Sequence, residues 1–399
     1  MASAEWSRVP VGIDASQWVT RGECRTVLAV VHTVTSGQRL LETVELIEED
    51  LRVQVVFTQA PDTFSNGVPE FLRMTKAVVL PWEQAIRERF DLAVTAAYGG
   101  LHLLHAPILV LPHGAGYGKA YQTGSAPLTY GLDAQRLLHN GRVLPSALVL
   151  SHVDQLDVLR QQCPQAVDNA VVAGDPCYDR MVASLPRRDA YRAALGIEPG
   201  CELVVVSSTW GRDSLLARCD DLLPRLIEEF GPRGGRVAAL FHPAVWFGHG
   251  PRQVEAWLAE CRDAGLILVG PHVDWRATVI AADHVVTDHG SVGVYAAAIG
   301  KSVLLADLPL KAVTSTGSAQ DLLRAEAPML SLNNPLREQF DAAQSRTGRL
   351  RDAISGRLTS QPGRSAAELR QAVYRLLNLP SPGRHRTLTP VPLSSREVL

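Results

Sequence analysis

The sequence lacks a long apolar run and an excess of charge of either sign. No stretch reaches the roughly 18 consecutive apolar residues that a membrane-spanning helix needs. Residues 1–18 contain no apolar core of the kind that a signal peptide requires. The formal net charge is −2, whereas a protein built to bind nucleic acid is usually strongly basic. These absences predict a cytoplasmic protein that does not bind nucleic acid.

Several catalytic and metal-binding motifs are also absent. The six cysteines are scattered without a C-x-x-C pair, which favours reduced thiols in the cytoplasm. There is no H-E-x-x-H zinc motif and no G-x-S-x-G nucleophile turn. The stretch "HGAGYGK" (113–119) fits neither the phosphate-binding loop G-x-x-x-x-G-K-[ST] nor the dinucleotide fingerprint G-x-G-x-x-G. We therefore expect no bound metal and no cofactor.

The sequence does contain a regular alternation of short apolar runs and helix-like segments. Its 399 residues exceed one ordinary core, so two domains are expected. The alternation continues to a charged joint near 179–200 and restarts at residue 201. Such βαβ units predict an α/β fold of two Rossmann-like domains with parallel sheets that face a cleft. The expected segments are a first domain at 20–180, a second at 200–360, a C-terminal helix at 361–380 and a disordered tail at 381–399.

Polar residues and glycines cluster where the predicted strands end. The carboxyl edge of a parallel sheet is its ligand-binding edge, so these residues are expected to line a binding site. The candidates are His32, His113, Asp175, Thr209, Trp210, Gly211, His242, Asp288, His289, Gly290, Ser291 and Val292.

The stretch "TDHGSVGVYAAAIG" (287–300) is the most informative of these strand ends. A strand ends in Asp288, a turn follows, and small residues predict a helix that starts near Ser291. The free amides and positive dipole end of a helix N-terminus suit a phosphate or pyrophosphate. Ser291 alternatively only caps its helix, and Asp288 binds either a ribose or the amides of its own turn. The sequence leaves both pairs of alternatives open.

Five motifs in order resemble those of the CDP-glycerol glycerophosphotransferase family, which includes the teichoic-acid polymerases and primases. They are "HGAGYGK" (113–119), "GDPCYD" (174–179), "SSTWGRD" (207–213), His242-Pro243 and "DHGS" (288–291). Each lies at a predicted strand end, and the five are spread over residues 105–310. The chain departs from the family pattern within the 115–118 loop and at Asp175, Cys177 and Gly290. The scaffold therefore matches the family better than the substrate-specific positions do.

The resemblance implies the GT-B arrangement and roles for two histidines. His113 would act as general base on an acceptor hydroxyl, and a positive His242 would stabilise the leaving phosphate, unless it only forms a turn. Gly114 and Gly116 would give the loop the flexibility to approach a ligand. Lys119 would contact phosphate or stay solvated. Asp175 and His32 would lie on the acceptor side.

The resemblance also implies a class of reaction. A transferase would move a glycerophosphoryl or glycosyl group from a CDP- or UDP-linked donor to an acceptor hydroxyl, for a cell-envelope polysaccharide. Most of the family works at a membrane, which implies peripheral attachment to the inner membrane face, and a homo-oligomer is compatible with the sequence. One alternative is an enzyme like the non-hydrolysing sugar-nucleotide epimerases. Another is a non-catalytic GT-B protein that binds a nucleotide or a polymer.

Overall fold

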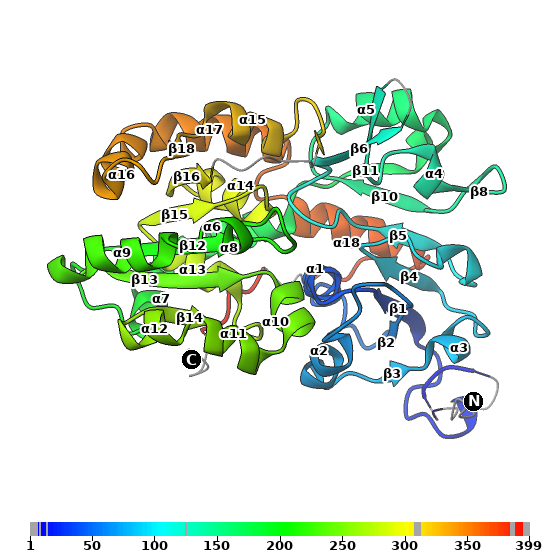
Figure 1. Ribbon diagram of the computed structural model, residues 1–399. Helices are drawn as coiled ribbons and strands as arrows, with labels where there is room; N and C mark the ends of the chain where they lie inside the picture. Colours follow the sequence, from blue (N-terminus) through cyan, green and yellow to red (C-terminus); the bar gives the residue numbers. More distant parts are fainter. Residues whose placement is uncertain are drawn as a thin grey trace. The chain divides into compact units, whose positions relative to one another are not determined.

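The chain forms two compact units, each with its own parallel sheet (Figure 1). The computed structural model describes residues 7, 9–12, 15–123, 126–306, 313–383 and 388–393. Unit 1 comprises Met1–Tyr117, Thr123–Cys177 and Thr359–Leu388, and unit 2 comprises Gly118–Gln122, Tyr178–Leu358 and Thr389–Leu399. The predicted α/β fold of two Rossmann-like domains is confirmed. Within the described ranges, no helix combines the length and apolar character needed to cross a membrane.

Unit 1 is built on a seven-stranded parallel sheet in the order β11-β10-β5-β4-β1-β2-β3. The strands are β1 (Arg25–Val31), β2 (Val53–Gln59), β3 (Val79–Leu80), β4 (Leu92–Thr95), β5 (Ile108–Val110), β10 (Ala147–Leu150) and β11 (Ala170–Val172). The chain moves outward from β1 to one side first and then to the other. The carboxyl ends of β1 and β4 therefore form the topological switch point, where open α/β sheets bind ligands.

Helices cover the sheet of unit 1, and several short elements extend from it. The central strands are continuously apolar because both faces of the sheet are buried. The helices are α1 (Val34–Val44), α2 (Val68–Thr75), α3 (Trp82–Ala85), α4 (Ala134–Leu137), α5 (Gln155–Gln162) and α18 (Ser365–Leu376), with short helices η1 (Ala15–Gln17), η2 (Leu101–Leu103) and η3 (Pro164–Asn169) and strands β7 (Ala126–Thr129), β8 (Leu138–His139) and β9 (Arg142–Val143).

Unit 2 is built on a six-stranded parallel sheet in the order β14-β13-β12-β15-β16-β18. The strands are β12 (Leu203–Ser208), β13 (Arg236–Phe241), β14 (Ile267–Val269), β15 (His284–Thr287), β16 (Ser302–Ala306) and β18 (Met329–Leu330). The order of the chain reverses at β12, so the switch point of this sheet lies between the carboxyl ends of β12 and β15. Outside this sheet, β6 (Lys119–Thr123) pairs antiparallel with β17 (Val313–Thr314).

The helices of unit 2 surround this sheet, and α6 begins at the boundary between the units. They are α6 (Pro176–Ser184), α7 (Arg188–Ala194), α8 (Leu215–Arg218), α9 (Leu222–Phe230), α10 (Pro243–His249), α11 (Pro251–Trp257), α12 (Ala259–Asp263), α13 (Trp275–Ala281), α14 (Ser291–Ala298), α15 (Ala319–Glu326), α16 (Leu336–Gln344) and α17 (Thr347–Leu358), with η4 (Leu185–Arg187) and η5 (Gly231–Arg233).

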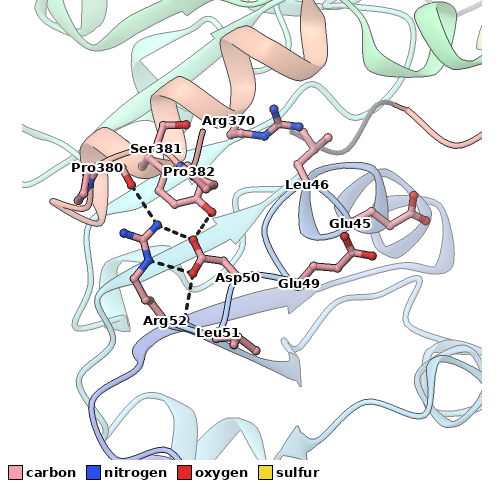
Figure 2. Close-up of a pocket in the computed structure, with 11 residues that line it drawn as sticks. Glu45, Leu46, Glu49, Asp50, Leu51, Arg52, Arg370, Pro380, Ser381 and Pro382 are labelled. Carbon is pink, nitrogen blue, oxygen red and sulfur yellow. Dashed lines mark hydrogen bonds and ion pairs between the residues drawn. The ribbon is translucent and has the colours of Figure 1, made fainter. Parts of the chain in front are cut away.

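A partly buried polar network holds the C-terminal helix α18 on unit 1 (Figure 2). The Asp50 carboxylate accepts hydrogen bonds from Arg52 Nη2 at 2.6 Å and from the Tyr374 hydroxyl at 2.7 Å, and Arg52 also donates to the Pro380 carbonyl. The Arg52 hydrogen bond holds the pKa of Asp50 well below its usual range, while burial raises the pKa of Tyr374 to about 12. The network borders a cavity of about 520 Å³ between the C-terminal end of α1 and α18. This end of α1 lies at the amino edge of the sheet, opposite the switch point.

Part of the tail is ordered, in contrast to the disorder expected for 381–399. Val391 is fully buried, its amide donates to Ser184 Oγ, and its carbonyl accepts from the Tyr191 hydroxyl. Arg180 donates to both the carbonyl and the hydroxyl of Thr389. A composition rich in proline and polar residues does not reveal one apolar residue that docks, so the expectation is wrong for 389–391. Residues 384–387 and 394–399 lie outside the described residues.

A buried lysine closes the end of α13 in unit 2. Lys301 Nζ donates to the carbonyl of Ile280 at 2.6 Å and to that of Ala282 at 2.8 Å. Burial lowers the pKa of Lys301 to about 7. The side chain therefore satisfies two carbonyls that the helix leaves without an intrahelical partner, at the cost of burying an amine.

We expect the free energy of unfolding to rise between about pH 7 and pH 10, because Lys301 is then deprotonated in the folded chain and protonated in the unfolded one. The slope from this one group reaches about 1.4 kcal/mol per pH unit. Urea denaturation across this range measures it. Lys301→Met should flatten the curve, whereas the exposed Lys76→Met should not. Equal slopes in the parent and Lys301→Met would contradict the assignment.

Candidate functional site

The predicted donor-side residues follow three neighbouring strands of unit 2. Thr209, Trp210 and Gly211 follow β12, His242 follows β13, and residues 288–292 follow β15. Since β13, β12 and β15 are adjacent in the sheet, the structure brings all these residues to one edge. The edge includes the switch point of the sheet, where ligand binding is expected.

Asp288 connects the loops after β12 and β15. Its Oδ2 accepts hydrogen bonds from the Thr209 amide and hydroxyl, both at 2.8 Å, and from the Leu215 amide at 3.1 Å. Its Oδ1 accepts from the Gly290 amide at 3.3 Å. The side chain is 3% exposed. Of the two roles left open by the sequence, this geometry favours the turn: the carboxylate positions both loops, and its binding capacity is largely used by the protein.

The N-terminus of α14 lies at this edge. Gly290 is its N-cap residue, and no side chain caps the helix among the described residues. A Cβ at Gly290 would lie 2.7 Å from Thr209 Cγ2, so glycine permits the close approach of the two loops. Ser291 and Val292 are the first two helical residues, and Ser291 is therefore not the cap. Their amides belong to the first turn, where anions are stabilised.

His242 is held in one orientation at the start of α10. Its Nδ1 accepts a hydrogen bond from the Ala244 amide at 3.1 Å, so the ring is the N-cap of this helix. A protonated Nδ1 could not accept that bond, so the geometry selects the neutral ring with its proton on Nε2. This corrects the expectation of a positive imidazole. The Trp210 ring, 42% exposed, lies 6.4 Å from the imidazole at a tilt of 42°.

In unit 1, His32 lies at the switch point between β1 and β4. Its Nε2 donates to the Gly99 carbonyl at 2.7 Å, and the residue is fully buried. Burial lowers the pKa of His32. Thr33 and Ser36 exchange hydrogen bonds between side chain and backbone, which starts α1 immediately after the histidine. His32 thus joins two loops inside the protein and offers no exposed surface to an acceptor.

His113 follows β5, next to β4. Its Nδ1 lies 3.2 Å from the Ala96 carbonyl, which only accepts, so Nδ1 carries a proton, and in the neutral ring Nε2 then carries the lone pair. The glycine-rich loop after it is packed, contrary to the flexibility expected. Ala115 and Tyr117 are buried, and the Gly116 amide donates to the Gly114 carbonyl. Gly116 has φ of +65°, and a Cβ there would lie 2.7 Å from Ser151 Oγ.

The remaining predicted residues are divided between the units. Lys119 is an exposed residue of β6, in a segment of unit 2, while His113 belongs to unit 1. Asp175 is fully buried after β11. Its carboxylate lies 3.3 Å from Arg39 Nη2 in α1. Asp175 is therefore a structural acid and not part of an open acceptor surface. His289 follows Asp288, with its Nε2 3.4 Å from Thr209 Oγ1.

Sequence reasoning missed Arg39 and Glu42. Arg39 Nη1 donates to Glu42 Oε2 at 3.0 Å, and Arg39 Nη2 donates to the Gly114 carbonyl at 2.8 Å. Both side chains are buried. The sequence did contain an indication of this pair. Ser36, Leu40 and Thr43 recur at helical spacing on the buried face of α1, and Arg39 and Glu42, spaced i,i+3, fall on the same face. Charged residues on a buried stripe indicate a specific internal partner.

Solved structures of the same fold share little sequence with this chain. The wall teichoic acid polymerase TagF, soaked with CDPG, has a TM-score of 0.60 and 13% identity, over 89% of this chain and 88% of that one. MnaA of S. aureus with UDP has a TM-score of 0.57 and 12% identity, over 90% of this chain and 98% of that one. UDP-GlcNAc 2-epimerase from Neisseria meningitidis bound to UDP-GlcNAc has a TM-score of 0.54 and 11% identity, over 88% of this chain and 100% of that one.

No family model matches the chain, and no curated protein matches it. At identities of 11–13%, these likenesses concern the fold alone. The two parallel sheets and the matched lengths show that this chain shares the fold of these solved structures, with two Rossmann-like units.

Proposed function

We propose that the chain is a transferase that moves a glycerophosphoryl or glycosyl group from a CDP- or UDP-linked donor to an acceptor hydroxyl. The observation that carries this proposal is the group of N–H donors at one edge of unit 2, which we propose as an anion site. There, the first turn of α14 has no side-chain cap among the described residues. His242, at the end of β13 and separated from β15 by β12, carries its proton on Nε2. Amide and imidazole N–H groups suit a nucleotide diphosphate, whose charge grows as it leaves.

Asp288 would contribute by positioning, since its bonds fix both loops that border the phosphates. Trp210, partly exposed beside His242, would form an aromatic wall of the same site. Neither role requires the residue to react.

Unit 1 would supply the base. The acceptor oxygen attacks the transferred group, the bond to the nucleotide leaving group breaks, and the acceptor proton passes to Nε2 of His113. The hydrogen bond from Nδ1 to the Ala96 carbonyl suits this role, because a proton on Nδ1 leaves the lone pair of a neutral ring on Nε2.

The ligands of the structural neighbours support this donor class. TagF was soaked with CDPG, MnaA was solved with UDP, and the epimerase was solved with UDP-GlcNAc. Nucleotides linked through a diphosphate thus recur on this fold. The CDP-linked donor is favoured because the ordered motifs of this sequence resemble the CDP-glycerol glycerophosphotransferases. A cell-envelope polymer is the corresponding acceptor.

Ser291→Glu tests the anion site. Glutamate in the first turn of α14 interacts favourably with the helix dipole, so the fold should persist, but its charge would repel phosphate. We expect CDP-glycerol and UDP-GlcNAc to bind the parent in a calorimetric titration and to bind Ser291→Glu at least tenfold more weakly. The matched control, Gln253→Glu, adds the same charge at the exposed start of α11. Equal affinity in Ser291→Glu and the parent would exclude this site.

A non-catalytic binding protein is the second candidate, because two carboxylates among the predicted site residues are used structurally. Asp288 and Asp175 both bind protein groups in the structure. The same observation weighs against an epimerase that would need acids lining its site. Product analysis after incubation with CDP-glycerol or UDP-GlcNAc separates the three: free nucleotide indicates transfer or hydrolysis, an inverted sugar indicates epimerisation, and binding without turnover indicates a binding protein.

A further inference from the structure

Arg39 makes the most extensive buried ionic contacts near the proposed base. Its side chain is 9% exposed, and the acids beside it, Glu42 and Asp175, are 2% and 0% exposed. One arm of the guanidinium, Nη1, donates to Glu42, and the other, Nη2, donates to the Gly114 carbonyl and to Asp175. The two acids hold the guanidinium in place, and the guanidinium in turn holds the carbonyl of the residue that follows His113.

The loop that carries His113 is therefore fixed from two sides. The Gly114 carbonyl accepts from Arg39 at 2.8 Å and from the Gly116 amide at 2.9 Å. The His113 ring is tied to the Ala96 carbonyl at the end of the neighbouring strand. The hydrogen bond at Nδ1 fixes one point of the His113 ring, but the ring also moves when the backbone of its loop moves. The position of Nε2 therefore depends on the hydrogen bond that holds the Gly114 carbonyl. Arg39, which lies on α1, is one residue outside the loop that donates to this carbonyl.

We propose that Arg39 is a positioning residue that sets the place and orientation of the His113 imidazole. The expected effect on catalysis rests on the proposed function. The expected effect on the loop rests only on the geometry of unit 1. Arginine is required because its planar fork donates to three acceptors in fixed directions, whereas lysine carries the same charge on a single nitrogen. Asp175 and Glu42 hold Arg39 through their ion pairs.

The kinetic test compares Arg39→Lys, His113→Ala and the double variant, with release of nucleotide from CDP-glycerol as the readout. A displacement of about 1 Å can lower a rate about 100-fold. We therefore expect Arg39→Lys to lower kcat by about 10- to 100-fold and to change the donor KM by less than about twofold. In the His113→Ala background, Arg39→Lys should lower kcat no further, because the group through which it acts is gone. Losses that multiply in the double variant would overturn the inference and leave the proposed base intact.

A second measurement does not depend on turnover. Hydrogen exchange of the amides at 114–117 should quicken at least tenfold in Arg39→Lys, because the loop loses its anchor, and should not change in Arg192→Lys. Arg192 is an equally buried arginine of unit 2, also 9% exposed, that binds an acid and backbone carbonyls. Unchanged exchange in Arg39→Lys overturns the inference even if His113 proves to be the base. Faster exchange supports the anchor even if His113→Ala retains parent turnover, a result that would instead refute the proposed base.

Discussion

His113→Ala should lower kcat with CDP-glycerol or UDP-GlcNAc by about 10²- to 10⁴-fold, which is the usual contribution of a general base. The affinity for the donor should change little, because the proposed anion site belongs to unit 2 and the histidine to unit 1. Steady-state kinetics beside a calorimetric titration on the same samples measures both quantities.

The matched control is His242→Ala. Its Nε2–H is proposed to contact the donor phosphate, so this variant should lose donor affinity and turnover together. His105→Ala, an exposed histidine of unit 1 outside the site, should behave as the parent does. Parent-like turnover in His113→Ala would return the loop to a purely structural role. A loss confined to donor affinity would instead make the loop part of the phosphate site.

Asp288→Ala should lower the free energy of unfolding by about 3 kcal/mol or more. The change leaves the buried Leu215 amide and the partly buried amides of Thr209 and Gly290 without their acceptor, and a buried donor left unpaired costs about 1–3 kcal/mol. Donor affinity should fall as well, because the loops that border the phosphates lose their connection. Urea denaturation followed by circular dichroism measures the stability.

Two variants bracket the Asp288 result. Asp288→Asn keeps the shape and one acceptor oxygen, so its loss of stability should be smaller than that of Asp288→Ala. Asp213→Ala removes a surface carboxylate that pairs with the exposed Arg218, and such pairs contribute about 0–1 kcal/mol. If Asp288→Ala is no less stable than Asp213→Ala, the carboxylate does not hold the two loops together.

The sequence was sufficient for the sheets and for the edges at which polar residues gather. Strand-like runs such as 201–209 and 236–243 mark buried parallel strands because a strand covered on both faces has few alternatives. The strand ends then follow, and with them His113, His242 and Asp288. What a pattern of this kind predicts is the location of a residue along the chain and at an edge of the sheet.

The hydrogen-bond partners of those residues could not be predicted from the sequence. The donors to His242 and to Asp288 include backbone amides whose positions depend on the fold. The "HGAGYGK" glycines suggested flexibility, yet Gly116 is there because Ser151, 35 positions away in the chain, leaves no space for a Cβ. Arg39 and Asp175 form a pair across 136 residues that neither local pattern reveals.

The discontinuous units restrict how such a protein can be recombined. Unit 1 needs residues 359–388 from near the C-terminus, and the buried side chains of Leu369, Val373 and Tyr374 show that α18 is part of its interior. A fragment ending at residue 177 would expose the surface that α18 covers. Exchange of a single contiguous block between relatives would therefore yield a hybrid with a mismatched core. A successful chimera has to transfer the C-terminal helix together with the N-terminal segments, so the two are expected to be inherited as one unit.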